Sequence, residues 1–321
     1  MSLPSLLAPI AEDMRAVDTV IRTRLDSQVS LIRTIGDYIV QAGGKRMRPA
    51  LLLMVARALG CDSPRQHELA AVVEFIHTAT LLHDDVVDES DLRRGRSTAN
   101  AVFGNAASVL VGDFLYSRAF QMMVDAGSPE IMRILADATN VIAEGEVLQL
   151  LNVHDPDVTE ARYLQVVRFK TARLFEAAAQ VGAELAGAAP EVVEAAAEYG
   201  RRVGTAFQLI DDVLDYSGDS TELGKNVGDD LREGKATLPL IRVMAVGTPE
   251  QRELIRNAIE AGHGDFAAVA EAIHATDALQ HARESARAEA QAASAALAAF
   301  PESPYKAAML AFADFAIERG H

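Results

Sequence analysis

"LLHDDVVDES", residues 81–90, places four acidic side chains at the end of an apolar stretch. Within it, Asp84, Asp85 and Asp88 form the pattern D-D-x-x-D. If the stretch is helical, Asp84 and Asp88 lie on one face, where like charges repel one another by about 0.2–0.5 kcal/mol. Taken alone, the pattern is compatible with a solvated helix end or with a site for a cation.

A second acidic run repeats the pattern. "FQLIDDVLDY" (207–216) contains Asp211, Asp212 and Asp215, again inside an apolar segment. In a helix, Gln208, Asp211 and Asp215 form one stripe, because residues three or four apart share a face. Two such runs inside apolar segments are hard to explain as solvated helix ends, so together they favour a cation site.

The first run extends into a similar stripe. In a helix His77, Thr80, Asp84 and Asp88 share one face, and two such helices that face each other would present carboxylate oxygens to a common cavity. Oxygen ligands favour hard divalent cations such as Mg²⁺, which keeps several waters and is commonly shared with phosphates. Neither run offers the His and Cys set that zinc prefers. We therefore predict a Mg²⁺ site.

The composition restricts the class of protein. The chain has 321 residues, half of them hydrophobic, and a net charge of −16. So acidic a chain lacks the basic face that a nucleic-acid partner requires. Cys61 is the only cysteine, which excludes an internal disulfide and fits a reducing cytosol. We expect a cytoplasmic protein, because the N-terminus lacks the basic region of a secretion signal and no apolar run is long enough to span a membrane.

The pattern of apolar residues predicts an all-α fold. Glycines and prolines separate long segments with helical spacing, and the alternation typical of strands is almost absent. Pro49 and Gly60 can start and end one helix. No linker or repeat divides the chain, so we predict a single domain, residues 1–321, built as a bundle of long helices. Further helices are predicted over 66–90, 106–126, 130–152, 159–187, 191–217, 236–246, 249–261, 265–274, 277–299 and 303–318.

Two dense cationic clusters stand out in this acidic chain: "GGKRMRP" (43–49) and "DLRRGRS" (91–97). Arg offers forked donors suited to phosphate oxygens, and Lys offers a compact charge. Metal-binding carboxylates together with many cationic donors indicate a polyphosphate ligand. Neither a G-x-x-x-x-G-K-[ST] loop nor a dinucleotide-binding glycine pattern occurs, which excludes nucleotide sites of those kinds. Other candidate donors are Lys170, Thr171, Lys225 and Lys235.

Taken together, these motifs resemble the trans-isoprenyl diphosphate synthases. The resemblance rests on "GGKRMRP", "EFIHTATLLHDDVVDESDLRRG", "FKTARL", "FQLIDDVLDY" and "GKNVGDDLREGKATLP", in this order between about residues 43 and 241. It implies an all-α fold around a deep apolar cavity, a homodimer, and three Mg²⁺ ions held between two Asp-rich helices. It also implies two substrates, isopentenyl diphosphate and an allylic diphosphate, and leaves room for peripheral membrane contact when product is released.

The segment after the first acidic run looks most like the long-chain bacterial members, those that make octaprenyl diphosphate from farnesyl diphosphate for quinone side chains. Short-chain members commonly carry R-R-G-x-P-T-x-H after the arginines, whereas Ser97 and Asn100 occupy the proline and histidine positions here. This departure weighs against a farnesyl diphosphate synthase. Heptaprenyl and nonaprenyl producers carry much the same motifs, so product length stays open between seven and nine units.

The resemblance assigns a role to each motif residue. For the metal it implies Asp84, Asp85, Asp88, Asp211, Asp212 and Asp215, with Asp84, Asp88 and Asp211 as direct ligands. For the allylic diphosphate it implies Arg93, Lys170, Thr171, Gln208, Lys225 and Lys235. For isopentenyl diphosphate it implies Lys45, Arg48, His77 and Arg94, although His77 could instead be a satisfied core histidine. The catalytic set is then Asp84, Asp85, Asp88, Arg93, Lys170, Asp211 and Lys225.

Product length is predicted to depend on the helix that carries Asp84. A tail that runs from the metal toward the N-terminus of this helix passes Thr80, Ala79 and then Ile76. Ala79 lies five residues before Asp84, about 7.5 Å along the axis. Small residues at 79 and 80 let the tail grow long, although close packing of another helix would also explain Ala79.

Three alternatives compete with chain elongation. A class I terpene cyclase also carries an Asp-rich run, but its second motif is usually N-D-x-x-S-x-x-x-E, and "DDVLDYSGD" differs from it. A non-catalytic subunit of a heteromeric synthase tends to lose a motif, and none is missing here. A di-iron bundle requires paired E-x-x-H motifs, and "EFIH" (74–77) is the only one. Prenyl elongation is the function that the sequence predicts.

Overall fold

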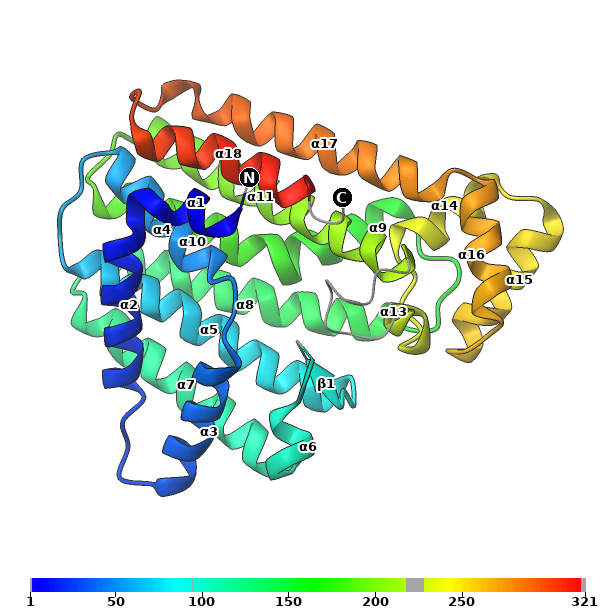
Figure 1. The fold of residues 1–321 in the computed structure, drawn as a ribbon, viewed down its shortest axis with the longest axis horizontal. Helices are drawn as coiled ribbons and strands as arrows, with labels where there is room; N and C mark the ends of the chain where they lie inside the picture. The colour runs from blue at the N-terminus through cyan, green and yellow to red at the C-terminus, as the bar shows by residue number, and fades with distance from the viewer. Residues whose placement is uncertain (1, 94, 218–227, 319–321) are drawn as a thin grey trace. The chain divides into compact units, whose positions relative to one another are not determined.

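The computed structural model describes residues 2–93, 95–217 and 228–318 and confirms the all-α fold class (Figure 1). Contacts divide the chain into two compact units, each made of three segments. Unit one comprises residues 1–139, 174–200 and 296–312, and unit two comprises residues 140–173, 201–295 and 313–321. The prediction of one domain over residues 1–321 stays a prediction.

Most helices begin and end close to the predicted residues. None of those described combines the length and apolar character needed to cross a membrane. The elements are α1 (Leu3–Leu7), η1 (Ala8–Ile10), α2 (Ala11–Arg24), α3 (Ser30–Ala42), α4 (Met47–Ala58), α5 (Arg65–Val87), β1 (Leu92–Arg93), β2 (Arg96–Ser97), α6 (Ala99–Phe103), α7 (Asn105–Asp125), α8 (Pro129–Asn152), α9 (Glu160–Val166), η2 (Val167–Ala172), α10 (Arg173–Leu185), α11 (Pro190–Tyr216), α13 (Asp229–Arg232), α14 (Leu238–Val246), α15 (Pro249–Ala261), α16 (Phe266–Ala275), α17 (Ala278–Ala296), η3 (Leu297–Ala299) and α18 (Pro304–Glu318).

Helix α4 is the most deeply buried helix of unit one. Its residues Pro49–Ala56 are all buried, and Met47 and Ala58 are buried as well. The helix begins two residues before the predicted Pro49, because a proline in the first turn interrupts no intrahelical hydrogen bond. The chain enters it through Arg46, whose φ is 44°.

Helix α5 packs against α2, α4 and α7 and carries the first acidic run at its C-terminal end. It was predicted to reach residue 90 but ends at Val87, because Glu89 adopts a φ of 50° and the helical conformation cannot continue. The chain then forms the hairpin of β1 and β2, in which Leu92 pairs with Ser97. This hairpin lies beyond the C-terminal end of α5 in Figure 1.

A buried carboxylate joins α2 to α4 and α5. Asp13 is 6% exposed, and it accepts hydrogen bonds from Arg57 Nε at 3.0 Å and Nη2 at 2.7 Å. His67 Nε2 lies 2.8 Å from its Oδ1, and Gln66 donates at 3.3 Å. Burial acts to raise the pKa of Asp13, but the hydrogen bonds from Arg57 and His67 outweigh it and hold this pKa below its ordinary value.

The core of unit two forms behind the second acidic run. Val213 and Leu214 of α11 pack with Tyr163 of α9, Ile241 of α14 and Ala286 of α17. This packing buries one side of the α11 segment that contains the run. The second Asp-rich segment is therefore supported by three other helices of its own unit.

The helix predicted over 159–187 is interrupted. Between α9 and α10, residues Val167–Ala172 form a π-helical segment, η2. Such segments are rare, and they occur frequently at functional sites. This one contains Lys170 and Thr171, two of the predicted phosphate ligands.

Candidate active site

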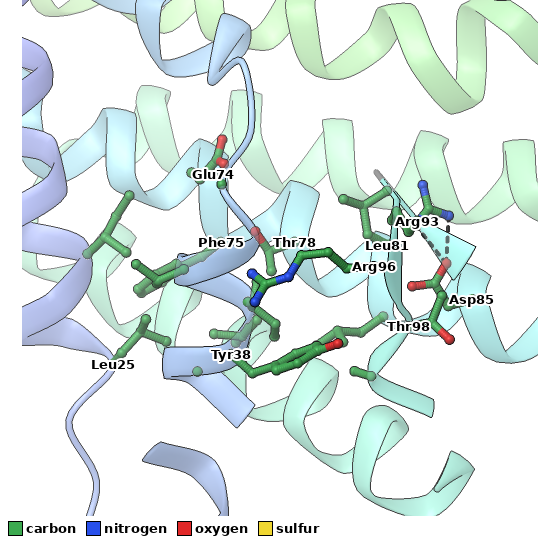
Figure 2. Close-up of a pocket in the computed structure, with 18 of the residues that line it drawn as sticks. Leu25, Tyr38, Glu74, Phe75, Thr78, Leu81, Asp85, Arg93, Arg96 and Thr98 are labelled. Carbon is green, nitrogen blue, oxygen red and sulfur yellow. Dashed lines mark hydrogen bonds and ion pairs between the residues drawn. The ribbon is translucent and has the colours of Figure 1, made fainter. Parts of the chain in front are cut away.

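The three aspartates of the first run have different environments. Asp84 and Asp88 are half-buried near the end of α5, whereas Asp85 is 4% exposed. Arg93 Nε and Nη2 both lie 2.7 Å from Asp85 Oδ1, as the dashed lines in Figure 2 show. Both donors contact the same oxygen, so the ion pair fixes the orientation of the Asp85 carboxylate. The metal contact of Asp85 stays a prediction.

Asn100 anchors the segment that follows α5. Its Nδ2 donates to the backbone oxygens of Asp85 at 3.1 Å and Ser90 at 3.2 Å. Thr98 Oγ1 also donates to the Ser90 oxygen, at 2.6 Å. These bonds hold the hairpin with Arg93 beside the aspartates, so the asparagine that departs from the short-chain pattern has a structural role here.

Arg48 and His77 are brought together in unit one. Arg48 Nη1 lies 3.1 Å from His77 Nε2. Because Arg can only donate, His77 Nε2 accepts, which places the proton of a neutral ring on Nδ1. The Arg48 guanidinium also lies 4.4 Å from the centre of the Phe175 ring. Lys45 is exposed just before α4, so of the residues predicted to bind isopentenyl diphosphate, Arg48 and His77 are the two that the structure brings into contact.

The three aspartates of the second acidic run also differ in burial. Asp211 is half-buried, whereas Asp212 and Asp215 are 2% and 5% exposed. Asp215 accepts hydrogen bonds from the backbone N–H groups of Asp229 at 3.2 Å and Asp230 at 3.3 Å, and so caps α13. Its prediction as a metal ligand therefore receives no support from its contacts.

Asp212 is held by two side chains. Tyr163 donates its hydroxyl to Oδ2 at 2.5 Å, and Gln208 Nε2 donates to Oδ1 at 2.8 Å. Burial, followed by the charge of Asp230, raises the pKa of Asp212 well above its ordinary value, although the two hydrogen bonds act in the opposite direction. Burial also raises the pKa of Tyr163. Like Asp85, Asp212 already has protein partners.

The two predicted phosphate ligands of the π-helical segment form hydrogen bonds with neighbouring helices. Lys170 Nζ donates to Glu146 Oε2 of α8 at 2.6 Å, and Thr171 Oγ1 donates to Gln208 Oε1 of α11 at 2.9 Å. Gly145 lets α8 approach this closely, because a Cβ at that position would lie 2.7 Å from the Lys170 backbone nitrogen. The absence of a side chain at Gly145 therefore sets the position of the segment.

The remaining predicted donors are placed only in part. Lys235 forms an ion pair with Glu233, and its backbone N–H donates to the Asp230 oxygen at 2.9 Å. Arg94 and Lys225 lie outside the described residues, so their assignments to the two diphosphates stay predictions.

The donor set fits a hard divalent cation. Asp84, Asp88 and Asp211 are the half-buried members of the two runs, and all three offer carboxylate oxygens. Among the described residues, no three His, Cys, Asp or Glu side chains form a group that could hold a metal ion. Mg²⁺ commonly uses one or two carboxylates together with substrate phosphates and waters, and its binding to these aspartates stays a prediction.

A cavity of about 90 Å³ lies beside α5 in unit one (Figure 2). Arg96 extends over the Tyr38 ring, 5.6 Å from its centre, and Arg93 and Asp85 lie at one side. The part of its wall contributed by α5 is Glu74, Phe75, Thr78, Leu81, Leu82 and Asp85.

The predicted chain-length residues do not line this cavity. Ile76 and Ala79 are fully buried on another part of the α5 surface, and Thr80 Oγ1 donates to the His77 backbone oxygen at 2.7 Å. The route of the product tail past these three residues stays a prediction. The cavity of Figure 2 is a separate feature.

Three residues of the site were missed by sequence reasoning. Glu146 and Gly145 contact the π-helical segment, and Tyr163 contacts the second acidic run. Tyr163 reads as an ordinary core aromatic, because only its position opposite Asp212 reveals its polar partner. Glu146 follows Gly145 in "AEGEV", a sequence that carries no recognisable ligand pattern.

The chain resembles known proteins along its whole length. Residues 29–276 match the family model described as polyprenyl synthetase. Octaprenyl diphosphate synthase of Escherichia coli (strain K12) is 54% identical over 321 residues, which cover 99% of each chain. An all-trans-nonaprenyl-diphosphate synthase (geranyl-diphosphate specific) of Rhodobacter capsulatus is 46% identical, with 98% of this chain and 97% of the relative covered. A polyprenyl synthase from Caulobacter crescentus CB15, crystallised with calcium and isoprenyl diphosphate, has a TM-score of 0.96 at 46% identity, covering 100% of this chain and 98% of that chain.

Proposed function

The chain belongs to the polyprenyl synthetase family and is a prenyltransferase, and we propose that it is a long-chain all-trans polyprenyl diphosphate synthase. It condenses isopentenyl diphosphate repeatedly, head to tail, onto farnesyl diphosphate to give octaprenyl diphosphate for quinone side chains. The observation that carries this proposal is the 54% identity to the Escherichia coli octaprenyl diphosphate synthase across 99% of both chains. The nonaprenyl relative at 46% identity makes nine units the alternative product length.

Asp84, Asp88 and Asp211 are proposed as the direct ligands of Mg²⁺. Their half-buried carboxylates support this choice, and the Caulobacter crescentus protein complexed with calcium and isoprenyl diphosphate supports a divalent cation. Bound Mg²⁺, three ions per site with substrate, would neutralise the negative charge that develops on the leaving diphosphate. The nearly fully buried aspartates, Asp85, Asp212 and Asp215, are proposed to orient the neighbouring ligands.

The allylic diphosphate is proposed to bind Lys170, Thr171 and Gln208, together with Arg93, Lys225 and Lys235. Lys170 and Lys235 are paired with carboxylates in this structure. Partly exposed pairs of this kind contribute about 0.2–1 kcal/mol, so a dianionic ligand can replace the carboxylate at low cost. The lysines are thus kept near the site before substrate arrives.

Isopentenyl diphosphate is proposed to bind Lys45, Arg48, His77 and Arg94. Arg48 supports this assignment because His77 and Phe175 already fix its guanidinium, and an ordered donor loses less freedom when a phosphate binds. The double bond of isopentenyl diphosphate attacks the allylic carbon of the other substrate. The bond between that carbon and its diphosphate oxygen breaks in the same reaction. Loss of a proton to the departing diphosphate then restores an allylic product, which can react again.

A homodimer is proposed from the exposed apolar surface of α7. Leu110 and Val124 are 67% and 61% exposed, and Val109 and Phe120 are more than a third exposed. An apolar surface along one helix of this kind supports contact with a second protein surface. A peripheral membrane contact is proposed for product release, because the product is a long apolar chain with a charged head.

Incubation of the purified chain with isopentenyl and farnesyl diphosphates tests the proposal. Mass spectrometry should show octaprenyl diphosphate with Mg²⁺ and no product with EDTA. Asp84→Ala should reduce turnover by at least about 10²-fold while the circular dichroism spectrum stays unchanged. A cyclic hydrocarbon product would indicate a terpene cyclase, and activity only after a second subunit is added would indicate half of a heteromeric synthase. Full activity of folded Asp84→Ala would refute the metal assignment.

A further inference from the structure

Tyr163 begins a chain of hydrogen bonds that ends at a proposed substrate ligand. Its hydroxyl donates to Asp212 Oδ2 at 2.5 Å, Gln208 donates to Asp212 Oδ1 at 2.8 Å, and Thr171 donates to Gln208 Oε1 at 2.9 Å. All four residues belong to unit two. The network of hydrogen bonds connects α9 to α11 and the π-helical segment, and the last two carry proposed ligands of this unit.

Because the residues are buried, these hydrogen bonds strongly restrict the position of the Asp212 side chain. Tyr163 is 6% exposed and Asp212 is 2% exposed, so water cannot easily replace a lost partner. A buried polar group without a partner costs about 1–3 kcal/mol, and more when it is charged. Asp212 therefore keeps its position only while Tyr163 and Gln208 both donate to it.

The position of Asp212 determines the direction of two ligands. Gln208 lies one turn before Asp212, and Asp211 is its neighbour on α11. The bonds from Tyr163 to Asp212 and from Thr171 to Gln208 reach α11 from two other elements and so restrict its rotation about its axis. Asp211 is then directed away from the buried side, and the Gln208 amide is oriented so that its oxygen meets Thr171.

We infer that Tyr163 is a positioning residue of the reaction: through Asp212 and Gln208, its hydroxyl holds Asp211 and Thr171 in the arrangement that binds the metal and the allylic diphosphate. This inference rests on the proposed function. Tyr163 itself contacts neither reacting atoms nor metal, so its effect is on the binding of the allylic diphosphate with Mg²⁺. The binding of isopentenyl diphosphate, whose described ligands lie in unit one, does not depend on it.

The test compares Tyr163→Phe with Tyr199→Phe in the full chain. Tyr199 is a matched control, because its hydroxyl is also buried and donates to the Met309 oxygen at 2.6 Å, which belongs to no proposed ligand. In Tyr163→Phe, we expect the KM for farnesyl diphosphate and the Mg²⁺ concentration for half-activity to rise about tenfold, as for loss of one hydrogen bond to a charged group. The KM for isopentenyl diphosphate should stay within about twofold. Tyr199→Phe should leave all three quantities unchanged.

A second measurement does not depend on turnover. Calorimetric titration of inorganic diphosphate in the presence of Mg²⁺ should show about tenfold weaker binding to Tyr163→Phe than to wild type or Tyr199→Phe. It tests the inference even if the wild type makes no polyprenyl product, an outcome that would refute only the proposed function. Equal binding and equal kinetics in the two tyrosine variants would overturn the positioning role.

A second pair of variants covers the case in which Tyr163→Phe does not fold. Asp212→Asn keeps one oxygen that can accept the Tyr163 hydrogen bond but loses the acceptor for Gln208, whereas Asp211→Asn removes a proposed metal ligand. If Asp212 acts by position, Asp212→Asn should lose about tenfold in turnover, as for one lost hydrogen bond, and Asp211→Asn should lose at least about 10²-fold. Equal losses in both variants would make Asp212 a metal ligand and overturn the inference.

Discussion

Gly145→Ala tests whether the place of the π-helical segment determines substrate binding. An added Cβ would lie 2.7 Å from the Lys170 backbone nitrogen, 2.9 Å from Phe169 Cβ and 3.0 Å from the Phe169 carbonyl carbon. Two of these neighbours are backbone atoms, which cannot move away by a change of rotamer. The substitution therefore has to displace the segment, or α8, as a whole.

The displacement can be estimated from these distances. Favourable contacts between carbon atoms begin near 3.5 Å, so relief of the overlap requires a shift of roughly 0.7 Å. Overpacking of this kind costs about 1–3 kcal/mol, of which the better helix propensity of Ala returns about 1 kcal/mol. We expect a modest loss of stability and a larger loss of function, because a shift of about 1 Å in a catalytic arrangement can cost about 10²-fold in rate.

Steady-state kinetics and thermal unfolding of two variants separate these effects. Gly182→Ala is the matched control, since its Cβ would lie 2.6 Å from the Leu52 oxygen and 3.1 Å from Val55 Cβ, between α10 and α4. Both variants should unfold at lower temperature, but only Gly145→Ala should raise the KM for farnesyl diphosphate, by about tenfold. If Gly145→Ala unfolds earlier yet keeps the wild-type KM and kcat, the position of Lys170 and Thr171 is not what the segment provides.

Two further substitutions test the division of the substrates and the control of product length. Arg48→Ala should raise the KM for isopentenyl diphosphate by at least about tenfold more than the KM for farnesyl diphosphate, because it removes a charged donor from one substrate alone; equal rises in steady-state assays would show that the division is wrong. Ala79→Tyr should shorten the product toward geranylgeranyl or farnesyl length while the first condensation continues, because an aromatic ring would block the route of the tail. An unchanged product distribution by mass spectrometry, together with a loss of about 1–3 kcal/mol in stability, would mean that Ala79 is small only for packing.

Most of the long helices were predictable from the sequence, but α2 and α3 were missed. Helix α2 went unpredicted because its apolar signal rests on few positions, and its buried residues are Asp13, Val17 and Ile21. The hairpin was missed because each strand has only two residues, too few for an alternation to appear. The π-helical segment changes the helical period over six residues, and no residue type marks such a change.

For the candidate site, too, the sequence predicted which residues share a helical face but not which side chains they contact. Spacing identified both acidic runs, because carboxylates three or four positions apart lie on one helical face. It could not separate Asp84 from Asp85, since burial and the Arg93 ion pair depend on how the chain returns after α5. Nor could it assign a polar role to Tyr163, whose partner Asp212 lies 49 residues away in sequence.

The burial of α4 has a consequence for the dynamics of the molecule. Because Pro49–Ala56 are buried throughout, an opening of this helix would expose apolar surface on every side. Its amide protons should therefore exchange with solvent only through opening events close to global unfolding. Arg48 stands in the first turn of this slowly opening helix, whereas Lys45 lies in the exposed segment just before it. The two cations proposed for one diphosphate thus belong to backbone segments that differ in burial, Arg48 to a helix that should open rarely and Lys45 to the exposed segment that precedes it.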